Sequence, residues 1–175
     1  LEDPLITLYG SMPSPSASAG ARPGRTRRVV APTVAATHAV ADALAAFCRA
    51  GDVVVLAGEM GAGKTAFAQG FGHSLGVTEP ITSPTFTLVQ TYRGADHNGR
   101  RVDFHHADLY RLDQLAEVAE LAFGELAEFG GIVVVEWGDV VAATLGEHLS
   151  VRLERADDDD DDRRVIIVEP AGPTW

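Results

Sequence analysis

The sequence is poor in several residue types, and each shortage argues against a class of protein. A single cysteine, Cys48, rules out a disulfide within the chain and is typical of a reducing cytoplasm. The chain has 14 Lys and Arg residues and 25 Asp and Glu residues, so its net charge is −11. This charge argues against a protein that binds nucleic acid by charge alone. Because no apolar run is long enough to span a bilayer, we expect a cytoplasmic protein without a membrane span.

The remaining composition is that of an ordinary globular protein. Apolar residues make up 46% and charged residues 22% of 175 residues, enough for one domain with a core. Residues 1–28 are rich in Ser, Pro, Ala and Gly, and we expect them to form a disordered tail. A transit peptide is the alternative, but the tail has no amphipathic stripe. Residues 29–175 are then the folded domain.

The first helix is predicted within residues 37–51. Thr37 is a candidate N-cap, and Val40, Leu44 and Phe47 recur at helical spacing on one face. Gly51 is the candidate residue at which the helix ends.

A second helix is predicted after residue 64, with Phe67, Phe71 and Leu75 on one face and Gly76 as its end. A third helix is predicted at residues 113–123, and strands at residues 52–58, 85–92, 101–108 and 132–137. Two further strands, at 148–154 and 163–169, flank an acidic loop at 157–162 and indicate a C-terminal β-hairpin. The alternation predicts an α/β fold: a single P-loop NTPase-like domain with a largely parallel or mixed sheet flanked by helices.

The segment GEMGAGKT, residues 58–65, matches the P-loop sequence motif and lies between a predicted strand and a predicted helix. Its glycines let backbone N–H groups surround a phosphate, and the helix N-terminus adds a positive dipole end. Lys64 would contribute charge at the β- and γ-phosphates, and the Thr65 hydroxyl would bind Mg²⁺. The residues predicted to bind the nucleotide are Glu59, Met60, Gly61, Ala62, Gly63, Lys64, Thr65 and Ala66.

Two carboxylates are candidates for binding the metal ion at this site. Glu136 ends the apolar run IVVVE, and ligands of open α/β sheets bind beyond the carboxyl ends of strands. Asp108 ends the strand at 101–108 and shares a strand face with His106, although it could instead cap a turn. Either residue could hold the metal or orient the attacking water. His105 and His106 face opposite ways, so they are a poor metal pair.

Thr85, in the segment SPT, could sense the γ-phosphate as switch threonines do, or it could belong to a plain proline turn. Trp137 follows Glu136 directly. Because successive strand residues point to opposite sides, we expect Trp137 to face away from the nucleotide, at the mouth of the site. There it is a candidate contact for a partner protein.

The motifs GEMGAGKT, SPTFTLV, HADLYRL and VVVEW stand in this order, and together they closely resemble the TsaE family, also called YjeE. The resemblance covers the chain from about Val29 to the last pair of strands. It implies a P-loop ATPase that uses Mg²⁺ in threonylcarbamoyl modification (t6A) of adenosine 37 in tRNAs reading ANN codons. It also implies that the protein acts with TsaD and TsaB homologues, and meets tRNA only through that complex.

Residue by residue, the resemblance carries roles onto six positions. It matches Lys64 and Thr65 to the phosphate and Mg²⁺ contacts, Thr85 to the switch threonine, Asp108 and Glu136 to the acidic positions, and Trp137 to the tryptophan that follows. Ala66 stands where the family often has a second threonine. A hydroxyl contact to the α-phosphate is therefore not expected here.

Two other functions compete with this one. The first is a small-molecule or nucleoside kinase, but the segment at residues 92–101 is too short for the lid domain that a kinase closes over its phosphates. The second is a nucleotide-gated binding module without useful turnover alone. ATP incubation with and without partners distinguishes the three functions.

Overall fold

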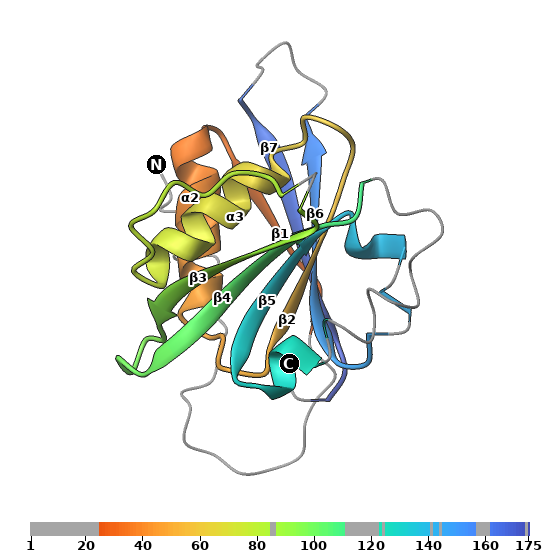
Figure 1. Cartoon of the computed structure of the whole chain (residues 1–175). Helices are drawn as coiled ribbons and strands as arrows, with labels where there is room; N and C mark the ends of the chain where they lie inside the picture. Colours follow the sequence, from red (N-terminus) through yellow and green to blue (C-terminus); the bar gives the residue numbers. More distant parts are fainter. Residues whose placement is uncertain are drawn as a thin grey trace.

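The computed structural model describes the larger part of the chain (Figure 1). The described residues are 25–84, 87–110, 123, 125–140, 142–143, 145–156, 162–173 and 175. Thr85 and nearly all of the predicted tail, third helix and acidic loop lie outside these ranges.

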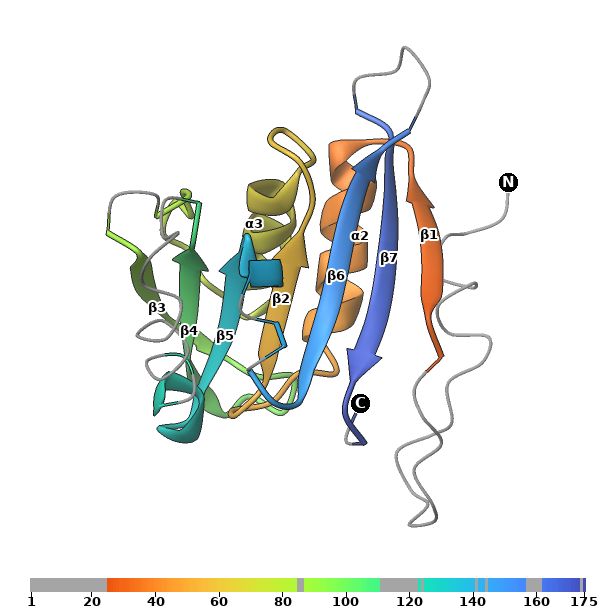
Figure 2. The same cartoon turned by 90° about the vertical axis from the view of Figure 1, so that its right-hand side faces the viewer.

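Seven strands form one mixed sheet in the order β1-β7-β6-β2-β5-β4-β3 (Figure 2). The strands are β1 Arg27–Ala31, β2 Val53–Ala57, β3 Val89–Ala95, β4 Arg101–Asp108, β5 Gly131–Glu136, β6 His148–Arg155 and β7 Arg164–Ala171. The central strands β4, β5, β2 and β6 run parallel, while β3, β7 and β1 each pair antiparallel with a neighbour. The predicted fold class and the C-terminal hairpin, formed by β6 and β7, are therefore confirmed.

The two strands at the centre are buried along their whole length. Every residue of β2 and β5 is buried, and both are dominated by valine. A strand covered on both faces needs a continuous apolar run, and β-branched side chains pack well on a pleated surface. This explains why IVVV precedes Glu136 without any polar residue in between.

Helices α2 (Val34–Ala45) and α3 (Lys64–Ser74) cover one face of the sheet side by side (Figure 1). Gly70 permits their close approach, because a Cβ at this position would lie 2.7 Å from the Cα of His38. The main core lies between these helices and the sheet. A smaller cluster, which includes Phe123, covers the opposite face. Neither helix, nor any other in the described residues, is long and apolar enough to cross a membrane.

Helix α3 agrees with its sequence pattern. Phe67, Phe71 and Leu75 are all buried in the main core. Gly76 follows the C-cap with φ +78°, and its N–H donates to the His73 carbonyl at 2.9 Å. A residue in this left-handed conformation is the usual end of a helix, and glycine adopts it without strain.

Helix α2 differs from its prediction at both ends. Thr33, not Thr37, is the N-cap: its side chain accepts from the N–H of Ala36 at 3.1 Å, and Thr37 is buried inside the helix. Phe47 lies beyond the helix and is 43% exposed, so it is not on the buried face. Gly51 is not the terminal residue, because the helix ends at Ala45. Threonine is a favourable N-cap residue at either position, and the structure uses the earlier one.

Two edge strands also differ from expectation. β3 begins at Val89 rather than residue 85, because Leu88 has φ +65° and its N–H donates to the Pro84 carbonyl. β1 begins at Arg27, two residues before the predicted start of the domain, and pairs with β7. That pairing joins opposite ends of the chain, so no local pattern indicates it.

Candidate functional site

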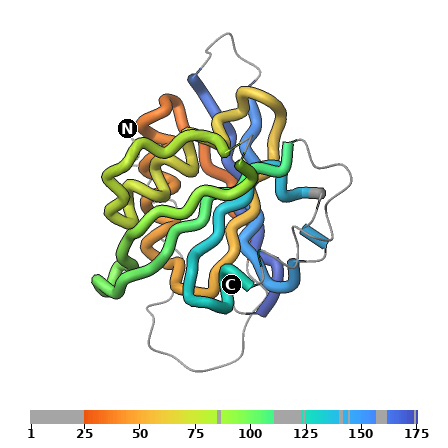
Figure 3. Tube along the Cα trace, viewed as in Figure 1, coloured from red at the N-terminus to blue at the C-terminus, as the bar shows by residue number. Residues whose placement is uncertain are grey.

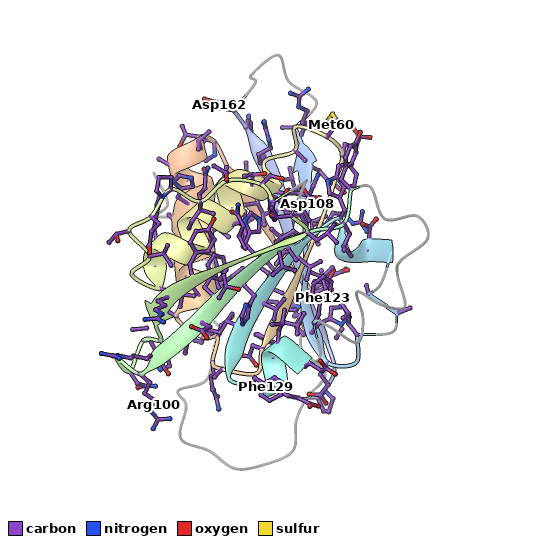
Figure 4. The ribbon with its side chains drawn as sticks, viewed as in Figure 1. Met60, Arg100, Asp108, Phe123, Phe129 and Asp162 are labelled. Atoms are coloured by element: carbon purple, nitrogen blue, oxygen red, sulfur yellow. The ribbon has the colours of Figure 1, made fainter. Side chains whose placement is uncertain are left out.

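The carboxyl ends of β2, β5 and β4 meet at one edge of the sheet, where the loop of residues 58–63 joins β2 to α3 (Figure 2). A cavity of about 370 Å³ opens there, and Figure 4 shows Met60 and Asp108 at this end of the molecule. The cavity is lined by Met60, Gly61, Gly63, Lys64, Thr65, Ala66, Ser83, Asp108, Tyr110, Glu136 and Trp137. Most residues predicted for the phosphate site thus surround one space.

The loop conformation depends on glycine at two positions. Gly58 has φ +141°, and a Cβ there would lie 2.3 Å from the Leu153 carbonyl oxygen. Gly63 has φ +102° and is the N-cap of α3, where it makes no side-chain capping bond. The first N–H groups of a helix have no partner within it, so they stay available for an anion.

Lys64 lies folded against the loop. It is 4% exposed, and its Nζ donates to the carbonyls of Gly58 at 2.7 Å and Glu59 at 2.8 Å. The same Nζ lies 3.7 Å from the centroid of the Trp137 ring, a cation–π distance. The ammonium group is therefore held at the cavity by neutral partners that a phosphate could replace.

Burial and nearby carboxylates act in opposite directions on the pKa of Lys64. Burial lowers the pKa of Lys64, and the carboxylates of Glu136, Asp108 and Asp139 oppose that shift. Removal from water disfavours the ammonium form, while nearby negative charge favours it. A bound phosphate would add to the second effect.

Thr65 and Glu136 meet across the cavity floor. The Thr65 hydroxyl donates to Glu136 Oε2 at 3.1 Å, and His106 Nε2 lies 2.8 Å from Glu136 Oε1. Both carboxylate oxygens therefore have a partner. Glu136 is 3% exposed, and it shares the helix-covered face of the sheet with Val134, two residues earlier on β5.

Asp108 lies beside Glu136, because the two residues are register partners in the parallel β4–β5 pair. Ser83 donates its hydroxyl hydrogen to Asp108 Oδ2, and the N–H of Tyr110 donates to Oδ1 at 2.9 Å. Figure 3 traces the connection after α3, which runs along the helical layer to this edge. Ser83 belongs to this connection and lines the cavity. Thr85, two residues further on, lies outside the described residues, so its predicted role stays a prediction.

The expected direction of Trp137 is wrong. Trp137 lines the same cavity as Glu136 instead of facing away from it. Its φ is +59°, a left-handed conformation outside the strand region, so strand alternation ends at Glu136. The indole packs 5.0 Å from the Tyr110 ring and contacts Lys64. A role in contacting a partner is not tested by this geometry.

Sequence reasoning missed Arg164 as a site residue. From the start of β7, its Nε donates to the Ala62 carbonyl at 2.9 Å and its Nη2 to the Gly61 carbonyl at 3.2 Å. These bonds fix two carbonyls of the glycine-rich loop from β7, a strand that does not flank the loop. Arg164 is 102 positions after Ala62 in the chain, and only the pairing of β6 with β7 brings it here, so the sequence carries no local signal for it.

The donor set limits which metal the site could hold. Among the residues that the structure describes, no three His, Cys, Asp or Glu side chains are grouped to bind a metal alone. Thr65 and Glu136 contribute neighbouring hard oxygen donors, and Asp108 is a second carboxylate close by. This arrangement fits Mg²⁺, which keeps several waters and takes one or two carboxylates together with substrate phosphates.

These features define the class of protein. A glycine-rich loop between a buried parallel strand and a helix, a lysine and threonine opening that helix, and a carboxylate ending the adjacent strand together form the architecture of P-loop proteins. The family model described as "Threonylcarbamoyl adenosine biosynthesis protein TsaE" matches residues 31–166. The chain belongs to the TsaE family.

Individual relatives agree with this assignment. The chain is 40% identical over 148 residues to the Mycobacterium bovis protein named "tRNA threonylcarbamoyladenosine biosynthesis protein TsaE", covering 81% of this chain and 85% of that one. It is 38% identical over 121 residues to the Bacillus subtilis protein of the same name, covering 69% and 72%. The crystal structure of Bacillus subtilis YdiB superposes with a TM-score of 0.68 at 30% identity, covering 86% of this chain and 89% of that one.

Proposed function

We propose that this chain is a Mg²⁺-dependent ATPase that serves threonylcarbamoyl modification of adenosine 37 in tRNA. The relatives named for t6A biosynthesis support the pathway. The observation that carries the ATPase assignment is the 3.1 Å bond between the Thr65 hydroxyl and Glu136, at the mouth of the glycine-rich loop. It joins the two side chains that a metal-assisted phosphoryl transfer requires beside the phosphates.

In this proposal the loop and the start of α3 bind the phosphates of ATP. The unpaired N–H groups at the start of α3 donate to the phosphates, and Lys64 exchanges its carbonyl partners and Trp137 for the β- and γ-phosphate oxygens. This exchange replaces neutral acceptors by charged ones, which form stronger hydrogen bonds with an ammonium group.

Hydrolysis needs a group that orients the attacking water. In this proposal Glu136 takes this role, with Asp108 beside it as the second carboxylate. A bound Mg²⁺ would be held by Thr65 with help from a carboxylate, and would neutralise charge developing on the phosphates. The reaction consumes ATP and water and releases ADP and phosphate.

Family membership supports a proposal for the partners and the cellular setting. We propose that the chain acts with homologues of TsaD and TsaB in the cytoplasm, and reaches tRNA only through them. The net charge of −11 supports an indirect role, because a protein binding tRNA alone would need a basic surface. We expect turnover to be weak without these partners.

A kinase would need a lid over the phosphates, and the β3–β4 connection offers none. Asp96 Oδ1 accepts from the N–H groups of Asn98 and Arg100, both at 2.9 Å, which closes a tight hairpin turn. The hairpin runs directly from β3 to β4. Because Asp108 at the end of β4 lines the cavity, this hairpin at the start of β4 lies away from the cavity and supplies no lid.

The test compares the wild-type chain with Lys64→Ala and Glu136→Gln. We expect calorimetry with Mg-ATP to show binding by the wild type and by Glu136→Gln, and loss of tight binding in Lys64→Ala. Phosphate release, measured with and without TsaD and TsaB homologues, should collapse in Glu136→Gln. Transfer of phosphate to a nucleoside, or unchanged ATP affinity in Lys64→Ala, would contradict the proposal.

A further inference from the structure

A histidine lies fully buried directly behind the carboxylate of the proposed site. His106 of β4 has 0% exposed surface, and its Nε2 lies 2.8 Å from Glu136 Oε1. It does not line the cavity, so it cannot touch a nucleotide there. Its only route to the chemistry is through Glu136.

The imidazole ring is held in one orientation by its neighbours. It stacks on the ring of Phe104, with a centroid distance of 6.3 Å and an interplanar angle of 9°. Phe104 in turn stacks against Phe71 of α3 and Tyr92 of β3. Because side chains two residues apart share a strand face, this stack aims the ring along β4 towards the carboxyl edge of the sheet.

The hydrogen-bond chemistry assigns a direction to this contact. An ionised carboxylate only accepts, so the shared hydrogen is on Nε2. His106 Nδ1 is buried and has no hydrogen-bond partner within the described part of the chain. Within the described residues, the imidazole ring therefore makes its hydrogen bond through Nε2, to Glu136. Burying an imidazole with one nitrogen unpaired is costly, and an apolar residue would fill the same space without that cost.

We propose that His106 is a positioning residue, and the proposal rests on the ATPase function above. Its Nε2–H holds Oε1 and so sets the rotation of the Glu136 carboxylate. Oε2 then points at the Thr65 hydroxyl, 3.1 Å away. Fixing one oxygen of a carboxylate presents the other in a single direction, as outer partners do for metal-site ligands.

The test uses two polar variants that differ in reach. In His106→Gln the side-chain amide can place an N–H where Nε2 stands, whereas the shorter amide of His106→Asn matches the position of Nδ1. We expect His106→Gln to keep most of the wild-type kcat. We expect His106→Asn to lower kcat by about 10- to 100-fold, with little change in KM for ATP.

Two readouts do not depend on turnover. The ratio of ATP affinities with Mg²⁺ and with EDTA should fall in His106→Asn but not in His106→Gln, while the nucleotide-free Tm of the two variants stays similar. In the nucleotide-free wild type, ¹⁵N NMR of the imidazole should show the tautomer with hydrogen on Nε2. The NMR measurement applies even where a variant fails to fold.

Three results would overturn the proposal: an Nδ1–H tautomer, wild-type kcat and Mg²⁺ dependence in His106→Asn, or equal impairment of both variants at matched Tm. The last result would make the role of His106 structural. A wild-type chain that binds no Mg-ATP would instead overturn the proposed function, and this inference with it.

Discussion

At the scale of single residues, the backbone changes direction at Trp137, directly after β5. A bulky residue with φ +59° is uncommon and persists only where its surroundings impose it. The next residue must be small, because a Cβ on Gly138 would lie 2.8 Å from Val55 Cγ1. The chain therefore leaves β5 sharply, and the indole comes to lie against Lys64.

Trp137 should report directly on the state of Lys64. The chain has two tryptophans, so Trp175→Phe leaves Trp137 as the only one. We expect saturating Mg-ATP to change its fluorescence emission, because the ammonium 3.7 Å from the ring moves to the phosphates. Adding Lys64→Ala to the same variant should abolish the change. Unchanged emission under conditions where calorimetry shows full binding would contradict this exchange.

At the scale of elements, the loop of residues 58–63 is held from two sides. Lys64 bonds its inner carbonyls, and Arg164 of β7 bonds the carbonyls of Gly61 and Ala62. The hairpin of β6 and β7 therefore supports the conformation of the loop. A loop with fewer fixed carbonyls would be less ordered before binding, so it would lose more conformational entropy when it binds phosphate.

Arg164→Ala should weaken ATP binding without unfolding the protein. We expect about a tenfold loss in affinity, the equivalent of about 1.4 kcal/mol, because two hydrogen bonds to the loop disappear. Arg164→Lys is the matched control: it keeps the charge but not the two-pronged geometry, and should recover only part of the loss. Calorimetric titration measures the affinities, and wild-type affinity in Arg164→Ala would show that the loop needs no support from β7.

At the scale of the whole molecule, the sheet separates two apolar clusters of unequal size. The larger one, between the sheet and helices α2 and α3, contains Phe67, Phe71 and Phe104 at 0% exposure. It lies directly beneath the proposed phosphate site, since α3 begins at that site. We therefore expect the stability of the fold and the placement of α3 to depend on the same packing.

Phe71→Ala should lower the free energy of unfolding by about 3–5 kcal/mol, the cost of emptying a buried aromatic position. Phe129→Ala is the matched control, because Phe129 is 89% exposed, and should change stability by about 0.5 kcal/mol or less. Denaturant titration followed by circular dichroism gives both values. Equal losses in the two variants would contradict the assignment of the core.

Local patterns predicted much of this fold correctly. The spacing of Phe67 and Phe71, the stop at Gly76 and the valine runs of β2 and β5 each depend on neighbours within a few residues. Helix periodicity and burial on both strand faces leave direct marks in a sequence. The ends of α2 were predicted less well, because a second threonine, Thr33, lies four residues before the predicted cap and is the N-cap in the structure.

The sequence by itself determined the glycine-rich loop, the first residues of α3, and a carboxylate at the end of β5. Each of these features is a pattern of adjacent residues. Tertiary structure alone decided that His106 bonds Glu136, that Arg164 bonds the loop, and that Trp137 turns back over Lys64. The first contact joins two neighbouring strands and the second joins β7 to the loop, so both depend on strand order and register. The third depends on one backbone angle, which the identity of a tryptophan does not reveal.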